Sequence, residues 1–354
     1  MPIFDQGYRH WSGHLASPAW RWLVITRRGL QTALQGRLVR MALLIAWVPA
    51  VVLAFVLCMW GLIERQSDLV ESIKPLLTSL LGRPVLAGPR EYRVEIWTLC
   101  FHYFLVWELW ISMVLVLLVG PNLISQDLRY NALPLYFSRP LRRIDYFVGK
   151  LGVIVALLSA VIILPAAVAY GLGLLFSLDI TIVRDTTGIL LASASYGLLI
   201  AVSAGMLMLA FSSLSRNSRY VALFWMAAWI LTGTVSWVLV MVENAHRMHQ
   251  AGIHRRDWAN EEFLTAELAA AKSDWRPLIS YTANLSRVGE RLLRTNAAWE
   301  RIGQLSPAGQ RSRFLRRMMG NQYPWYWSAA VLAGLFAVSA WILNRSIRSL
   351  DRLK

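Results

Sequence analysis

Six apolar runs, each long enough to cross a bilayer as a helix, constrain this chain more than any other feature of its sequence. Spanning about 30 Å of hydrocarbon takes roughly 20 helical residues, because every backbone N–H and C=O group must be bonded within the segment. The runs occupy residues 41–63, 97–119, 151–176, 188–214, 220–242 and 326–343. Charged residues make up only 16% of the chain, whereas a soluble domain carries about a quarter. The sequence therefore predicts an all-α membrane protein with six transmembrane helices.

The segments that join the six runs differ in charge. Segments 1–40, 120–150, 215–219 and 344–354 hold 17 Lys/Arg against four acids, while the other joining segments hold 19 against 15. Short loops rich in basic residues stay on the cytoplasmic side of a membrane. We therefore expect an integral protein of a bacterial-type inner membrane, with both termini in the cytoplasm.

This arrangement divides the chain into four parts. Residues 1–40 form a cytoplasmic N-terminus, and residues 41–242 form five transmembrane helices with an inner loop at 120–150. Residues 243–325 form a long extracytoplasmic loop, and residues 326–354 form the sixth helix and a basic cytoplasmic tail. The fourth run is rich in small side chains between Ala192 and Gly205, which predicts that another helix packs closely against it.

Before the first run, residues 18–39 have the pattern of an amphipathic helix. Leucines recur at helical spacing, and polar side chains fall on the opposite side. The leucines are Leu23, Leu30, Leu34 and Leu38, and the polar residues are Arg21, Arg28, Thr32 and Gln35. With Trp20 and Trp22 nearby, the pattern predicts an interfacial helix on the lipid of the inner membrane surface. A solvated helix in a small cytoplasmic domain is the alternative.

The sequence lacks the common catalytic motifs. Its Gly149-Lys150 pair is followed by Leu151 and has no upstream glycine loop, so it is not a phosphate-binding G-x-x-x-x-G-K-[ST] motif. Neither G-x-S-x-G nor H-E-x-x-H occurs. We therefore expect no catalytic residues, no cofactor and no enzymatic activity, and any ATP would be bound by another chain.

The charge distribution, the cysteines and the histidines give no indication of nucleic-acid binding, of a disulfide or of a metal site. The net charge is +16, but no dense Lys/Arg tract, zinc-finger or RNP signature indicates nucleic-acid binding. Cys58 and Cys100 lie inside apolar runs and are expected to be free thiols. His246 and His249 are three residues apart and His254 lies further on, yet no third ligand has suitable spacing, so we expect no metal site.

The most informative segment is the loop at 120–150. Gly120-Pro121 ends the second run, a short leucine-bearing helix follows, and Ser138-Arg139-Pro140 turns the chain. Basic side chains then lead into the third run. A rigid, charged protrusion of this kind is what a membrane domain needs in order to be moved by a soluble motor. Basic residues that only fix the orientation of the chain are the alternative.

This loop resembles that of the type-2 ABC exporter permeases. The pattern in that family is an acidic residue, a leucine-rich stretch, Ser-Arg-Pro, a basic pair and a closing Gly-Lys. The matching residues here are Asp127, Leu133, Leu135, Ser138, Arg139, Pro140, Arg143, Tyr146, Gly149 and Lys150. Segments 4–13 and 214–225 are also similar to parts of these permeases. The loop departs from the commonest version in having Gln126-Asp127 where a Glu-Arg pair usually opens it.

The resemblance implies the transmembrane permease subunit of an ATP-driven exporter. Two permease subunits, in a homodimer or a heterodimer, would carry two ATP-binding cassette ATPase subunits docked on the loop as a coupling helix. The docking residues that the resemblance implies are Asp127, Leu133, Leu135, Arg139, Pro140, Arg143, Tyr146 and Lys150. The substrate is not identified, because an apolar, aromatic sequence suits lipophilic cargo and a lipid-facing surface equally.

Glu108 is the only acid within the six runs and lies near the centre of the second. A carboxylate at that depth costs a few kcal/mol to insert, which indicates a functional residue that faces the bundle interior and a translocation path. A protonated or hydrogen-bonded packing residue is the alternative. As a proton relay, Glu108 would instead make the chain a proton-coupled secondary transporter. A membrane-embedded enzyme would need acids or histidines on facing runs, and Glu108 and His102 both lie on the second.

Overall fold

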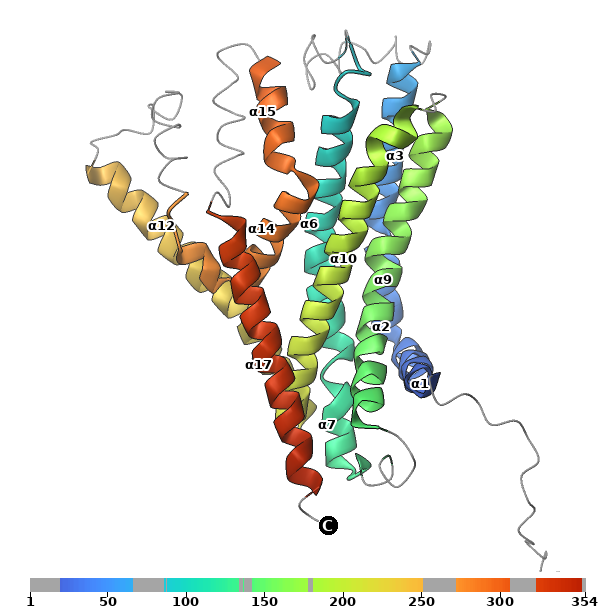
Figure 1. The fold of residues 1–354 in the computed structure, drawn as a ribbon, viewed down its shortest axis with the longest axis vertical. Helices are drawn as coiled ribbons and strands as arrows, with labels where there is room; N and C mark the ends of the chain where they lie inside the picture. The colour runs from blue at the N-terminus through green and yellow to red at the C-terminus, as the bar shows by residue number, and fades with distance from the viewer. Residues whose placement is uncertain are drawn as a thin grey trace, which may run out of the picture.

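The computed structural model describes residues 20–65, 86, 88–133, 136, 142–177, 181–250, 272–305 and 323–351. Over these residues the chain is all-α and contains no strand. Long helices run side by side along the length of the molecule, and the last of them, α17 (Trp325–Asp351), ends where the short helix α7 (Asn122–Arg129) lies (Figure 1). This end of the bundle is called the α7 end below.

Six stretches of the described chain are long and apolar enough to cross a membrane. Three of them are built from more than one helix, and three are single helices. In chain order they are α2 (Arg37–Ala46) with α3 (Val48–Glu64), α6 (Arg93–Val119) with α7, α9 (Arg143–Phe176), α10 (Thr181–Leu214), α11 (Ser218–Met226) with the π-helical turn η2 (Ala227–Leu231) and α12 (Thr232–Gln250), and α17 (Trp325–Asp351). The predicted all-α fold with six membrane-spanning helices is confirmed.

Several of these helices are longer than the apolar runs that predicted them. Helix α9 begins at Arg143, ahead of the run that starts at Leu151. Its first turn is stabilised by Asp145, whose Oδ2 atom accepts a hydrogen bond from the Arg142 backbone N–H at 3.3 Å, and an acid suits the positive end of the helix dipole. A hydropathy pattern detects only the apolar part of a helix, so it misses polar turns such as this one at the ends of the helix.

Helices α9 and α10 pack closely through glycines, as the small residues of the fourth run predict. A Cβ atom added to Gly197 would lie 2.9 Å from the Ile162 side chain, and one added to Gly205 would lie 2.6 Å from Leu151. Without water to drive apolar association inside a membrane, close backbone approach is what brings dispersion contacts into range. This pair lies at the centre of the bundle, where α9 and α10 each also contact α6.

The segment at 18–39 is not one helix. Helix α1 (Arg21–Gln35) ends at Gly36, whose extended backbone (φ −67°, ψ 125°) separates it from α2. Helix α1 packs on the first turns of α9, where the Thr26 hydroxyl donates a hydrogen bond of 2.9 Å to the Gly149 carbonyl. Its side chains Leu23 and Leu34 stay exposed, whereas Leu30 packs against the core, so only part of the leucine face that the sequence singled out contacts the bundle. The interfacial role of α1 stays a prediction.

Part of the long segment 243–325 packs against the membrane-spanning helices. It contains a 3₁₀ turn, η4 (Arg276–Ile279), and a helical hairpin of α14 (Tyr281–Leu293) and α15 (Thr295–Leu305). The hairpin lies beside α6, α10 and α17 (Figure 1), and the Tyr281 hydroxyl lies 2.6 Å from the Ser203 hydroxyl. Ser203 lies 22 residues after Thr181, the first residue of α10, which corresponds to roughly 33 Å along the helix at 1.5 Å per residue. The hairpin therefore contacts α10 far from its first residue. The sequence predicts this segment only as part of a long extracytoplasmic loop and does not reveal the hairpin, because the polar composition of the hairpin hides how much of it is buried.

Candidate functional site

An ion pair and a hydrogen bond join α7 to the start of α9 at the α7 end. The Tyr146 hydroxyl donates to the Asp127 Oδ2 atom at 2.7 Å, and the Lys150 Nζ atom lies 2.7 Å from the same oxygen. Tyr146 and Lys150 are four residues apart on α9 and therefore share one face of that helix. The Asp127 and Lys150 side chains are 16% and 12% exposed, so solvent screens this contact less than it would a surface ion pair.

Aromatic and aliphatic side chains pack around this pair. The Tyr136 and Tyr146 rings lie 5.4 Å apart, and the Lys150 Nζ atom lies 5.5 Å from the centre of the Tyr146 ring. Leu133 and Ile25, the latter from α1, complete the cluster. Burial, followed by the nearby negative charge of Asp127, raises the pKa of the Tyr136 hydroxyl. Three separate segments, α1, α7 and α9, therefore meet at one partly buried polar contact.

A second contact, which the sequence did not reveal, fixes the start of α7 to α10. The Ser212 hydroxyl, fully buried in α10, accepts hydrogen bonds from the Ile124 and Ser125 backbone N–H groups at 3.1 and 3.0 Å, and donates to the Pro121 carbonyl at 3.1 Å. It thereby caps α7 from a different helix, because the first N–H groups of a helix have no partner within it. A serine inside an apolar run carries no sequence signal for this role.

The structure brings together some of the predicted docking residues. Asp127, Tyr146 and Lys150 form one contact, and Arg143 lies exposed at the first residue of α9. Leu133 is only 4% exposed, and its side chain packs against Tyr146 within the chain. Leu135, Arg139 and Pro140 lie outside the described residues, as does Ser138.

Glu108 lies in the middle of α6 with its side chain fully buried. Neither carboxylate oxygen has a hydrogen-bond partner among the described residues, and the hydroxyl of Ser112, one turn further along α6, has none either. Buried polar groups are nearly always bonded, since leaving one unsatisfied costs about 1–3 kcal/mol. The interior position expected for Glu108 is present, and Glu108 is one of the buried polar side chains to which the described residues supply no hydrogen-bond partner.

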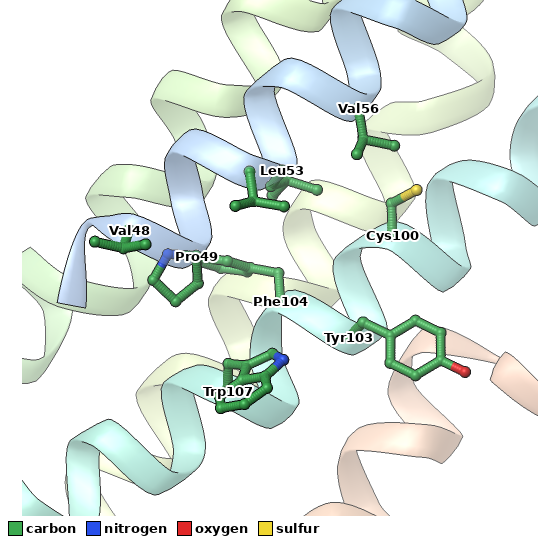
Figure 2. Close-up of a pocket in the computed structure, with 9 residues that line it drawn as sticks. Val48, Pro49, Leu53, Val56, Cys100, Tyr103, Phe104 and Trp107 are labelled. Carbon is green, nitrogen blue, oxygen red and sulfur yellow. The ribbon is translucent and has the colours of Figure 1, made fainter. Parts of the chain in front are cut away.

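An apolar groove runs between α3 and α6 on the outside of the bundle (Figure 2). Its volume is about 500 Å³, and it is lined by Val48, Pro49, Val52, Leu53, Val56, Cys100, Tyr103, Phe104 and Trp107. Trp107 and Val52 are more than half exposed. Such a lining fits a hydrocarbon chain and offers few polar groups with which to recognise anything else.

A buried ion pair closes the opposite end of the bundle. The Arg93 Nε and Nη2 atoms lie 2.9 and 2.7 Å from the two oxygens of Glu64, and the Trp60 indole donates to Glu64 at 2.8 Å. Arg93 is 3% exposed. Bidentate geometry and an additional donor are the conditions under which a buried pair tolerates its desolvation. Glu64 and Arg93 thus join α3 to α6, and no pattern in the sequence indicates that these two residues pair.

The cysteines and histidines that the sequence offered as candidates form no cluster among the described residues. Cys58 and Cys100 are free thiols. His246 and His249 lie on α12, His254 falls outside the described residues, and no group of three metal-binding side chains occurs in the part of the chain that the structure describes. A comparison with protein families finds no family model that matches the chain, and a comparison with curated proteins finds no match.

Proposed function

We propose that this chain is the transmembrane permease subunit of an ATP-driven exporter, and that α7 with the segment following it is where a separate ATP-binding cassette ATPase docks. The observation that supports this most is the contact of Asp127 with Tyr146 and Lys150. A soluble motor can move a membrane domain only if the element that it pushes is attached rigidly to the helices that must move. Asp127 provides that attachment on α9, and Ser212 provides it on α10.

In this proposal, α7 transmits motion to the centre of the bundle. Closure of two ATPase subunits on ATP would displace α7, and the displacement would reach α9 through Asp127 and α10 through Ser212. Because α9 and α10 are packed through Gly197 and Gly205, they would shift together. Alternating access would follow from this movement, with two permease subunits, identical or different, around one path. Like the family it resembles, the chain would carry no catalytic residues itself.

The test of docking uses the isolated permease and its ATPase partner. Leu135→Asp places a charge where the resemblance implies an apolar anchor, so it should abolish co-purification of the ATPase, while Arg142→Ala should have little effect. Central apolar anchors carry more binding energy than charges at the rim of an interface. Full binding and full transport-stimulated ATP turnover by Leu135→Asp would remove the docking role of this loop.

The proposal places the α7 end and both termini in the cytoplasm of a bacterial-type inner membrane. In a Cys58→Ser/Cys100→Ser background, cysteines introduced at Ser138 and Ser346 should resist an impermeant thiol reagent in intact cells. Cysteines at Ser273 and Thr181 should react. Labelling of position 273 only after permeabilisation would place 243–325 inside and contradict this orientation.

A second candidate function is proton-coupled transport, which the unpartnered Glu108 favours. The two candidates differ in their energy source. An ATP-driven exporter should lose transport when the ATPase partner is withheld and keep it when a protonophore is added, and a proton-coupled transporter should show the reverse. Transport by the chain alone in vesicles with a pH gradient would decide for the second candidate.

A further inference from the structure

A groove at the α7 end lies between α1 on one side and the junction of α6 and α7 on the other. Its volume is about 550 Å³. Val39 on α2 and Leu118 and Val119 at the end of α6 give it an apolar wall, and Arg28 on α1 with Asn122 and Gln126 on α7 adds polar side chains. The groove therefore offers both an apolar surface and hydrogen-bonding or charged groups to a ligand.

The charge around this groove is positive. The described segment from Trp20 to Ala46 carries five arginines and no acid. Within the groove lining, Asp127 and Lys150 neutralise each other at 2.7 Å, which leaves the Arg28 guanidinium as the net charge. Arg28 makes one long contact of 3.5 Å to the Gln31 side chain, so most of its five donor hydrogens stay available for a ligand.

We propose that this groove binds one anionic glycerophospholipid of the leaflet at the α7 end. The phosphate would lie beside Arg28 within reach of the Asn122 and Gln126 side chains, and an acyl chain would lie against Val39, Leu118 and Val119. Basic clusters next to a membrane-spanning helix attract anionic lipid by about 1 kcal/mol for each Lys or Arg. A single-chain apolar ligand leaves Arg28 unused, and a free anion leaves the apolar wall in contact with water. A phospholipid places its phosphate beside Arg28 and covers the apolar wall with an acyl chain. The inference needs only the position of α1 at a membrane surface and is independent of the proposed transport function.

The experiment is native mass spectrometry of the purified full chain in a neutral detergent, titrated with phosphatidylglycerol, phosphatidylcholine or inorganic phosphate. One phosphatidylglycerol should bind at least about fivefold more tightly than phosphatidylcholine, the ratio that one cation near an anionic headgroup supplies. Arg28→Gln should remove this preference. Arg27→Gln changes the neighbouring residue of the same helix, is exposed and does not line the groove, and should leave the preference intact.

A second variant tests the position of the ligand without changing the charge. Asn122 is exposed and lines the groove, so Asn122→Trp should block the site, lower phosphatidylglycerol binding tenfold or more, and preserve the fold. Equal losses in Arg27→Gln and Arg28→Gln would show diffuse surface attraction and overturn the site. Equal affinity for both lipids, or displacement of the lipid by millimolar phosphate, would also overturn it.

Discussion

The Asp127 Oδ2 atom lies 2.7 Å from the Lys150 Nζ atom, and these residues belong to different helices, α7 and α9. The same oxygen accepts the Tyr146 hydroxyl at 2.7 Å. If this contact attaches α7 to the bundle of the proposed exporter, then weakening it should uncouple ATP turnover from transport while the protein stays folded. Hydrogen bonds to charged groups contribute only about 1.5–3 kcal/mol each, which is a fraction of the stability of a six-helix bundle.

If the chain is the permease subunit of an ATP-driven exporter, Asp127→Asn should therefore preserve ATPase binding and ATP turnover but lower the transport that accompanies each turnover by about tenfold. The control is Asp145→Asn, which makes the same charge change in the first turn of α9, where the asparagine side-chain oxygen can still accept the Arg142 backbone N–H. The measurement is transport per ATP hydrolysed in vesicles that contain both subunits. Unchanged coupling in Asp127→Asn would contradict the attachment role.

Leu133 is expected to act inside the chain and not at the ATPase surface. Its side chain packs with Tyr146 and Ile25, so Leu133→Ala should destabilise the isolated protein by about 2–5 kcal/mol, the range for a buried leucine. The comparison is Ile144→Ala, since Ile144 is 71% exposed and should cost much less. Thermal unfolding of the protein alone in detergent checks this. Equal melting temperatures for Leu133→Ala and Ile144→Ala would show that Leu133 does not stabilise the fold and would support a docking role for it instead.

Arg93 should be essential for the stability of the end opposite α7. Arg93→Ala leaves the buried Glu64 carboxylate without its two-point partner, and breaking a buried pair in this way costs about 3–5 kcal/mol. Arg93→Lys should recover only part of this loss, because an ammonium group cannot reproduce the two parallel contacts. Arg90→Ala, at an exposed position nearby, is the matched control for thermal unfolding. A loss below about 1 kcal/mol in Arg93→Ala would show that Glu64 finds another partner.

Glu108→Gln should leave the fold intact or stabilise it. The wild-type carboxylate makes no hydrogen bond to the described residues, so the amide loses no contact, and it removes an ionisable group from a site where charge is costly. Glu108→Ala should be destabilising, because it leaves a cavity. Transport separates the two candidate functions: an ATP-driven exporter should tolerate Glu108→Gln, and a proton-coupled transporter should lose activity in it.

The parts of this structure that the sequence predicts are those set by one-dimensional rules. The six spans follow from the need to satisfy backbone groups within each helix, and the close packing of Gly197 and Gly205 follows from their size. Contacts across the chain do not follow in this way. Asp127, Tyr146 and Lys150 could each be named as candidates from the loop pattern, but their shared contact required the fold. Ser212, 91 residues from the Pro121 carbonyl that it bonds, had no signal at all.

The α14–α15 hairpin was missed because its polar residues find partners inside the bundle. Arg287 donates to the Tyr323 carbonyl at 2.7 Å and lies 3.1 Å from Glu290. Hydropathy counts both side chains as polar whether or not they are paired. The single-residue signal that remains is Gly289, whose missing side chain allows α14 to approach the Tyr196 ring on α10.

Gly289→Ala should accordingly detach this hairpin from α10. The added Cβ atom would lie 2.6 Å from the Tyr196 ring, and overpacking of this kind costs about 1–3 kcal/mol, more than the roughly 1 kcal/mol that alanine gains over glycine in a helix. Gly334→Ala in α17 is the matched control, because its Cβ atom would meet nothing within 4 Å and only the helical gain should be seen. The melting temperature should thus fall in the first variant and rise slightly in the second. The double variant Gly289→Ala/Tyr196→Leu replaces the facing ring by a smaller side chain and should recover part of the loss. Additive effects of the two changes would mean that α14 does not contact Tyr196.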